Sequence, residues 1–335
     1  MTPKQYTINF FDDEPQETTS KDSGIFSHSF TKDDRAAAVP PSVALRNRIL
    51  EDDLKRQPIC YMSFGSGSSG NSCYIGTRNG GVIVDAGVNS DIIETSLRAN
   101  GVDMSNVKGL CLTHDHSDHV RYAYKLLRSH KHIKLYCTLR VLNAILRRHG
   151  ISKRIKEYHQ PIFKEIPFKI ADFEITAFDV PHDAADNAGF HFLAPSGKTF
   201  VMATDLGAVS PRARHYMEQA DYLMIEANYD AQMLRNGPYP EYLKARIATE
   251  HGHLDNEDTA ALLKEIAGGR LKHIFLCHLS KDNNTPEKAL STIRGALEAS
   301  GLRVGDGNET LTDRAADVQL QALPRFQPTR WYVVH

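Results

Sequence analysis

The sequence predicts an α/β protein in which two β-sheets are flanked by helices. Short runs rich in β-branched and aromatic residues, separated by glycine turns, indicate strands. These runs fall into two groups, and helical segments stand between the strands of each group. Such an order fits two sheets covered by helices better than one purely parallel sheet.

The N-terminal part differs from the rest of the chain. Residues 1–56 are polar and show little periodicity, so we expect a flexible extension there. Residues 57–335 show no linker-like change of composition and no internal repeat, which predicts a single domain. Its first strands are expected at 59–64, 71–75 and 81–85, followed by a helix from Ser90 to Gly101.

The loop 65–71 (Gly-Ser-Gly-Ser-Ser-Gly-Asn) could cradle a phosphate with its backbone N–H groups. It lacks the Lys-Ser/Thr ending of a P-loop and a strand follows it, so a plain turn is the preferred interpretation. Further along, we expect helices at 119–130, 139–149 and 210–219, after Asp255 and from Pro286. Strands are expected at 133–137, 159–165, 167–180, 188–194, 198–204, 222–226 and 273–277, with one or two closing strands within 318–334.

The composition is that of an ordinary globular protein, with 41% hydrophobic and 24% charged residues and a formal net charge of −1. Overall basicity therefore does not indicate a nucleic-acid ligand. The five cysteines form no CxxC pair, which is typical of reduced cysteines in a cytosolic protein. The N-terminus does not resemble a signal peptide, and no apolar run is long enough to span a membrane. We expect a soluble, cytoplasmic protein without a membrane partner, and leave its oligomeric state open.

The strongest functional signal is the segment Thr113–His119 (Thr-His-Asp-His-Ser-Asp-His), which lies between an expected strand and an expected helix. Imidazoles and carboxylates are common ligands of first-row metals. In an extended turn His114 and His116 point the same way and can bind one ion, while Asp118 and His119 can bind a second. The alternative is a polar loop with chance histidines, and we prefer the metal site.

Four later segments place a histidine or carboxylate near the end of an expected strand or the start of a helix. They contain His182, Asp205, the pair His251 and His253, and His278. Taken singly, each is weak, because such a histidine is more often a hydrogen-bonded structural residue and such an aspartate a turn residue. Their order after the HDHSDH segment favours a shared site.

These motifs resemble the metallo-β-lactamase-fold hydrolases, whose signature is HxHxDH followed by a histidine, an aspartate and a last histidine. Within that superfamily the chain is similar to the bacterial YycJ/WalJ-type group. The similar segments are Phe64–Ser72, Val180–Ala184, Ile225–Tyr229, Gly252–Asn256 and His278–Pro286. Asp255 departs from the serine expected in the fourth segment, but aspartate is also a good helix N-cap.

The resemblance implies a four-layer αββα sandwich with two metal ions at one edge, between the sheets. It implies that His114, His116 and His182 bind one ion, that Asp118, His119 and His278 bind the other, and that Asp205 bridges them. Zinc suits these ligands, and manganese or iron would also fit. The similarity to the tRNase Z type of phosphodiesterase implies that Glu226 orients His253, which would donate a proton to the leaving group. The alternative for Glu226 is a carboxylate in a surface ion pair. The candidate catalytic residues are therefore Asp118, His253 and Glu226.

Substrate residues are harder to identify. Residues 121–156 contain eleven Lys or Arg and no Asp or Glu, so they form either a polyanion-binding face or a set of solvated helix faces. Five further residues are candidate substrate contacts: Lys244, Arg246, Ser280, Asn283 and Asn284. The last three could instead cap the following helix.

The resemblance implies a dinuclear metal-dependent phosphodiesterase that acts on nucleic acid, specifically a 5′–3′ exonuclease on DNA with a role in repair. One alternative is a hydrolase of a small cyclic or monoester phosphate that uses the same residues. Another, from a different class, is a non-catalytic metal-binding scaffold. The filled ligand positions argue against the scaffold, while the sequence leaves DNA or RNA and exo or endo cleavage open.

Overall fold

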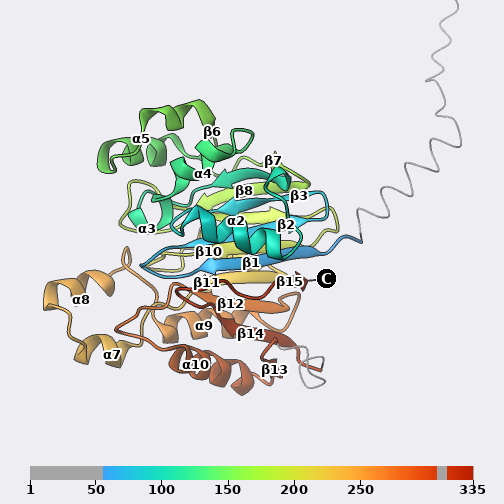
Figure 1. Cartoon of the computed structure of the whole chain (residues 1–335). Coiled ribbons are helices and arrows are strands. Elements are labelled where there is room, and N and C mark those ends of the chain that lie inside the picture. Colours follow the sequence, from blue (N-terminus) through green and yellow to red (C-terminus); the bar gives the residue numbers. More distant parts are fainter. Residues whose placement is uncertain (1–55, 308–314, 335) are drawn as a thin grey trace, which may run out of the picture. The chain divides into compact units, whose positions relative to one another are not determined.

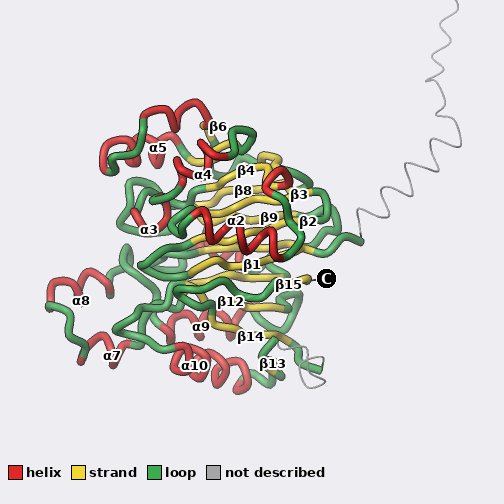
Figure 2. Tube along the Cα trace, viewed as in Figure 1, coloured by secondary structure: helices red, strands yellow, loops and turns green. Residues whose placement is uncertain are grey.

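The computed structural model describes residues 56–307 and 315–334, shown as a cartoon in Figure 1 and by secondary structure in Figure 2. The predicted extension at residues 1–56 thus lies outside the described residues, apart from Arg56. The strands are β1 (Ile59–Gly65), β2 (Ser72–Thr77), β3 (Gly80–Val84), β4 (Val107–Cys111), β5 (Lys134–Cys137), β6 (His159–Pro161), β7 (Phe168–Ile170), β8 (Phe173–Asp179), β9 (Ala188–Leu193), β10 (Thr199–Ala203), β11 (Tyr222–Glu226), β12 (His273–Cys277), β13 (Val304–Gly305), β14 (Val318–Ala322) and β15 (Tyr332–Val334).

The α-helices of the described chain stand mostly between these strands. They are α2 (Ser90–Ala99), α3 (Ser117–Val120), α4 (Ala123–Ser129), α5 (Leu139–Arg148), α6 (Pro211–Met217), α7 (Ala231–Asn236), α8 (Glu241–Ile247), α9 (Asn256–Ile266) and α10 (Pro286–Ala299). Two 3₁₀ turns, η1 (Met104–Asn106) and η2 (Lys153–Tyr158), complete the set.

Within the described residues the strands form two mixed sheets. The seven-stranded sheet has the order β15-β1-β2-β3-β4-β5-β6, and the eight-stranded sheet has the order β13-β14-β12-β11-β10-β9-β8-β7. Strands β1 and β15, from opposite ends of the described chain, pair antiparallel with Ile59 opposite Val334. This pairing supports our proposal that residues 57–335 form one domain.

Side-chain alternation along the strands builds the layers. In β12, Phe275 and Cys277 point into the cluster that fills the space between the sheets, while Ile274 and Leu276 point into the cluster beneath α9 and α10. A third cluster joins the outer face of the other sheet to α2, α4 and α5. The result is a four-layer arrangement of helices, sheet, sheet and helices (Figure 1), so the predicted fold class is confirmed.

The helices follow from local sequence. In α5, the side chain of Thr138 accepts a hydrogen bond from the backbone N–H of Val141, which caps the first turn. The buried residues Val141, Leu142, Ala144 and Ile145 lie on one face of α5, and Arg147 and Arg148 occupy its last turn.

Some predicted elements differ from the structure. The helix expected at 119–130 is divided into α3 and α4, because the backbone N–H of Tyr122 bonds to the carbonyl of Ala86 instead of continuing the first helix. The strand expected at 159–165 ends at Pro161, which has no N–H to donate. Helices α7 and α8 were not predicted, and α8 has no buried residue that would produce an amphipathic signal.

The topology gathers several chain reversals at one edge of the sandwich. Strands β3, β4 and β5 are parallel, as are β10, β11 and β12, so the carboxyl ends of each set lie at the same edge. The segments that follow β3, β4, β8, β10, β11 and β12 carry the polar residues of the candidate site. Ligand sites outside the carboxyl ends of strands are common in α/β folds.

Candidate metal centre

The segment after β4 supplies the first half of the centre. The side chains of His114 and His119 are fully buried, and that of His116 is 28% exposed. The backbone fits closely here, because the amide of Asn71 donates to the carbonyl of Asp118 at 2.8 Å. A Cβ atom on Gly87 would lie only 1.5 Å from that same carbonyl oxygen, so only glycine fits.

The glycine- and serine-rich loop 65–71 supports this turn. Several of its backbone N–H groups bond within the protein, with Gly67 donating to the side chain of Asn71 and Gly70 donating to the carbonyl of Gly67. The side-chain nitrogen Nδ2 of Asn71 also lies 3.1 Å from Oδ2 of Asp118 and 2.8 Å from Nε2 of His119. These contacts agree with the interpretation as a plain turn, one that holds the turn after β4.

The second half of the centre comes from the other sheet. His182 follows β8 and donates from Nδ1 to the carbonyl of Gly252 at 3.0 Å, so its Nε2 faces the centre. Asp205 follows β10, and its Oδ2 accepts a hydrogen bond from the hydroxyl of Thr204. His278 follows β12 and is 4% exposed.

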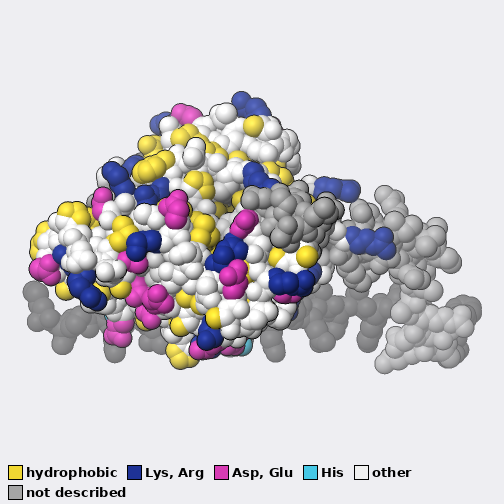
Figure 3. Space-filling model, turned by 90° about the horizontal axis from the view of Figure 1, so that it is seen from below, with side chains coloured by type: hydrophobic (Ala, Val, Ile, Leu, Met, Phe, Trp, Pro, Cys, Tyr) yellow, Lys and Arg dark blue, Asp and Glu magenta, His cyan; other side chains and the backbone are white. Residues whose placement is uncertain are grey.

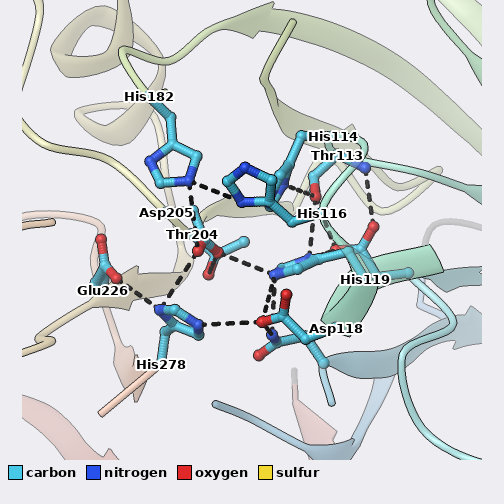
Figure 4. A network of polar contacts seen from close by, with 12 residues as sticks. Thr113, His114, His116, Asp118, His119, His182, Thr204, Asp205, Glu226 and His278 are labelled. Atoms are coloured by element: carbon cyan, nitrogen blue, oxygen red, sulfur yellow. Dashed lines mark hydrogen bonds and ion pairs between the residues drawn. The ribbon is translucent and has the colours of Figure 1, made fainter. Parts of the chain in front are cut away.

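Figure 4 shows how the two halves meet around Asp205. His114, His116 and His182 form one group, and Asp118, His119 and His278 form another, each with ligand atoms within 4.8 Å of one another. Asp205 lies between them, with Oδ2 at 3.2 Å from Nε2 of His119 and Oδ1 at 3.9 Å from Nε2 of His182. The structure therefore brings together all seven residues that the sequence singled out as metal ligands.

These residues also fit metal ions chemically. Nε2 of His114 and Nε2 of His278 are buried and have no hydrogen-bond partner within the described residues. An unpartnered buried nitrogen is costly, and a metal bond would satisfy it. Because each group offers three nitrogen or oxygen donors, the residues suit two divalent ions such as zinc.

Three residues around the centre adopt a left-handed backbone conformation. Asp85 has φ 58°, Asp205 has φ 54° and His278 has φ 53°, and each lies one or two residues after the end of a strand. Such conformations cost a non-glycine residue about 1 to 3 kcal/mol and persist where the surrounding structure enforces them. Their concentration at one edge marks this edge as a functional site.

Asp85 is a residue of the centre that the sequence interpretation missed. Its Oδ2 lies 2.7 Å from Nδ1 of His119, and its two carboxylate oxygens also accept hydrogen bonds from the N–H and hydroxyl of Thr113. A carboxylate behind a ligand histidine fixes the ring orientation and raises the ligand's basicity. The available signal was the position of Asp85 at the end of a strand, as for Asp205.

Glu226, at the end of β11, is fully buried and contacts two histidines. Its Oε1 lies 2.8 Å from Nδ1 of His253 and 2.8 Å from Nδ1 of His278. The sequence interpretation included the first contact only. This geometry leaves Nε2 of both histidines free of Glu226, and it argues against the alternative of a surface ion pair.

Burial and neighbouring charged groups act in opposite directions on the pKa values of Asp205 and His253. Burial opposes ionisation of Asp205, but His278 and His119 lower its pKa well below the usual range. Burial alone would lower the pKa of His253, but Glu226 raises it, so His253 holds a proton more readily than an ordinary histidine. At His114, burial lowers the pKa well below the usual value, which favours the neutral form that binds metals.

The candidate substrate residues are placed unevenly. Arg246 and Ser280 line a pocket of about 200 Å³ beside His253. Lys244 lies outside it, because its Nζ bonds to the carbonyl of Arg235 and to Glu241. Asn283 and Asn284 are buried, and the amide of Asn284 bonds to the carbonyls of Ala227 and Asn228, so these two hold the loop and do not face the pocket.

The basic block 121–156 is divided among α4, β5, α5, η2 and the segments between them, and its Arg148 lines a pocket over the centre. Arg148 donates to Oδ2 of the buried Asp115 at 2.7 Å, and its side chain is still 54% exposed. A pocket of about 330 Å³ over the turn after β4 is lined by Asp115, His116, Asp118, Arg148 and Arg246, among others. Two arginines, Arg148 at the end of α5 and Arg246 in α8, thus line the pocket over the centre.

A different charge pattern covers the side of the molecule where α9 and α10 lie. On the face seen in Figure 3, Lys and Arg side chains are interspersed with Asp and Glu side chains. Mixed charges of this kind give no single-sign surface that would attract a polyanion. A membrane span is not found either: among the described residues, no helix combines the length and apolar character that it requires.

Comparison with known proteins agrees with the fold and the site. The family described as the beta-lactamase superfamily domain matches residues 81–277. Exodeoxyribonuclease YycJ of Bacillus anthracis is 34% identical over 245 residues, which cover 73% of this chain and 91% of that protein. Exodeoxyribonuclease WalJ of Streptococcus pneumoniae serotype 2 is 36% identical over 246 residues, covering 73% and 90%. The chain belongs to the YycJ/WalJ-type group of the metallo-β-lactamase-fold superfamily and is a metal-dependent hydrolase.

Solved structures show the same fold at low sequence identity. The metallo-β-lactamase-fold protein YhfI of Bacillus subtilis aligns with a TM-score of 0.55 at 13% identity, covering 83% of this chain and 100% of that one. The short form of human tRNase Z aligns with a TM-score of 0.52 at 16% identity, covering 81% and 98%. At such identities the likeness extends to the fold alone.

Proposed function

We propose that this protein is a nuclease that uses two divalent metal ions, and that it degrades DNA as a 5′–3′ exonuclease. The observation that carries this proposal is the contact of the buried Glu226 with the partly exposed His253, beside two three-residue ligand groups that have Asp205 between them. Thioester hydrolysis expels a thiolate that needs no positioned acid, whereas phosphodiester cleavage expels an alkoxide that does.

The ligand assignment follows the two groups. His114, His116 and His182 would hold one ion, Asp118, His119 and His278 the other, and Asp205 would contact both. When bound, such ions lower the pKa of a shared water and neutralise charge on the phosphoryl group. We propose zinc, with manganese or iron as alternatives, because imidazole and carboxylate ligands suit all three.

The protein's own residues would orient the substrate and move the proton. The water oxygen bonds to phosphorus, the bond between phosphorus and the leaving oxygen breaks, and that oxygen needs a proton. Nδ1 of His253 is fixed by Glu226, so the proton to be donated is held on Nε2. Asp118, the third candidate catalytic residue, keeps Oδ2 within 3.7 Å of Nε2 of both His119 and His278.

Support for DNA as the substrate comes from two sources. The relatives described above are named exodeoxyribonucleases. Arg148 and Arg246 stand at the mouth of the centre, where guanidinium groups can bind phosphates on either side of the scissile bond. The 5′–3′ direction, a role in DNA repair and a cytoplasmic location belong to the same proposal and rest on the group resemblance and the cysteine pattern.

The test uses the metal-loaded protein with end-labelled single-stranded DNA, double-stranded DNA, RNA and bis-p-nitrophenyl phosphate. We expect stepwise shortening of DNA from its 5′ end, and expect His253→Ala to keep its metal while cleaving about 100 to 10,000 times more slowly. Cleavage of the small ester alone would contradict the nuclease and favour the small-phosphate alternative. No turnover with any metal would favour a scaffold.

A further inference from the structure

The pocket beside His253 has two chemically different sides. Polar lining residues include His253 and Asn228, which both contact Glu226 of the centre, and apolar lining is supplied by Leu243 and Ile247 of α8 together with Tyr239. Arg246 also lines this pocket and the neighbouring one over the turn after β4, where it pairs with Asp183 at 2.5 Å. The two pockets are therefore adjacent, and the guanidinium group of Arg246 stands where they join.

Helix α8 contributes the apolar side without belonging to the core. None of its residues is buried, and Figure 1 shows α7 and α8 standing out from the sheets. Polar contacts hold this segment in place: the hydroxyl of Tyr239 donates to Asp282 at 2.9 Å, and the N–H of His253 donates to the carbonyl of Ile247 at 2.9 Å.

Leu243 and Ile247 are four residues apart on α8, so they lie on the same face of the helix. That face is turned to the pocket, where both side chains are only partly buried. Tyr242, in contrast, is 76% exposed and does not line the pocket. An apolar helix face that contacts a pocket and no core cluster is typical of a surface that a ligand covers.

The arrangement restricts the chemistry of that ligand. A phosphate suits the part next to Arg246, because Arg246 also lines the neighbouring pocket that contains His116 and Asp118. The other end must be flat and largely apolar to contact Tyr239, Leu243 and Ile247, as a nucleobase would be. The hydroxyl of Ser280, which also lines the pocket, accepts a hydrogen bond from the N–H of Asn283 and is hydrogen-bonded to the hydroxyl of Tyr239.

We propose that this pocket binds the leaving nucleoside, meaning the nucleoside whose oxygen departs from phosphorus, and that Tyr239, Leu243 and Ile247 contact its base. His253 indicates which of the two nucleosides the pocket binds. A group that protonates the leaving oxygen must lie next to the leaving nucleoside, and His253 lines this pocket. This inference rests on the proposed nuclease function and adds a base-binding subsite to it. Such a subsite also accounts for a position of α8 that core packing does not explain.

The test compares two DNA dinucleotides that differ only in the leaving nucleoside, which carries thymine in one and is an abasic tetrahydrofuran residue in the other. The wild-type enzyme should show a kcat/KM about tenfold higher for the thymine substrate. The double variant Leu243→Ser, Ile247→Ser should lose most of this preference, because it removes two of the three base contacts and leaves His253 in place. Tyr242→Ser, on the same helix, is the matched control and should keep the tenfold preference.

A second readout does not need activity. Thymidine binding to the metal-free protein, measured by titration calorimetry, should weaken about tenfold in the double variant and stay unchanged in Tyr242→Ser. Equal kcat/KM for the two dinucleotides with wild-type enzyme, or a preference governed by the base on the retained nucleoside, would overturn the subsite. If the wild-type protein cleaves neither dinucleotide, the nuclease function fails, and thymidine binding alone decides whether the pocket recognises a nucleoside.

Discussion

Strand β12 begins with one histidine and leads directly into another, and the two have opposite surroundings. His273 is 7% exposed and His278 is 4% exposed, so burial does not distinguish them. Nε2 of His273 lies 3.0 Å from Oε1 of Gln321, and its ring stacks on Phe275. Nδ1 of His278 lies 2.8 Å from Oε1 of Glu226, and Asp118 and Asp205 stand close to its ring.

The pKa values follow these partners. Burial lowers the pKa of His273 to about 4, and the amide of Gln321 offsets that only in part. Burial acts on His278 in the same direction, but Asp205, Asp118 and Glu226 raise its pKa to about 10. On β12, the carboxylates around His278 place it in a cation-binding centre, while the amide and aromatic partners of His273 leave it a neutral core residue.

The largest expected effect comes from removing each histidine in turn. His278→Ala should lose one metal ion and more than about 100-fold of activity, because a ligand matters at least as much as the groups behind it. His273→Phe should keep its metal and most of its activity. Metal content after gel filtration, measured by plasma mass spectrometry, and phosphodiesterase rates check both. Full metal content in His278→Ala, with a native circular-dichroism spectrum, would contradict the assignment.

A smaller effect is expected when the carboxylate behind His278 becomes an amide like the one behind His273. Glu226→Gln should lower kcat about 10- to 100-fold and weaken metal binding, because Glu226 holds both His278 and His253. His253→Ala is the matched variant, since it removes the proton donor and leaves the support of His278 intact. Chelator titrations that give identical metal affinities for the two variants would mean that the Glu226–His278 contact has no role.

The sequence singled out the seven predicted ligands that the structure brings together, and Glu226 beside His253, but it did not reveal Asp85 or Asn71. His114 and His278 belong to motifs with recognisable spacing, so pattern and resemblance found them. Asp85 supports His119 from 34 residues away, and such a contact depends on how two strand ends meet in space. Asn71 was predicted only as part of a polar loop, and its contacts with Asp118 and His119 were not predicted. Helix α8 was missed because its apolar face contacts a pocket and carries no core periodicity.

His273, the first residue of β12, should make the free energy of unfolding decrease as the pH falls. In the folded protein the pKa of His273 is about 4, against about 6.5 for an unfolded histidine, so the unfolded chain binds the proton more readily. This stability is fully present above pH 6.5 and decreases as the pH falls from 6.5 towards 4. The loss should be roughly 2 kcal/mol between pH 7 and pH 5.

His273→Phe keeps a flat ring beside Phe275 and removes this titration. Urea unfolding at pH 7, 6 and 5 should show the free energy of unfolding of the variant falling less than that of the wild type. The groups near His273 are Arg330, which lowers its pKa, and Tyr332, whose ring lies 5.7 Å away. Parallel pH profiles for the two proteins would mean that His273 is not held neutral by burial.

The smallest expected effect is a change in the pKa of His273 when this histidine receives a carboxylate partner like that of His278. Gln321→Glu places an acidic oxygen where Oε1 of Gln321 now faces Nε2 of His273. The pKa of His273 should rise by roughly one to three units, which histidine NMR titration would measure. Metal content should stay unchanged, because the described residues near His273 do not form a group of three ligands. If the pKa of His273 stays near 4, burial and Arg330 outweigh a carboxylate at this position. The hydrogen-bond partner alone would then not explain why the pKa values of His273 and His278 differ.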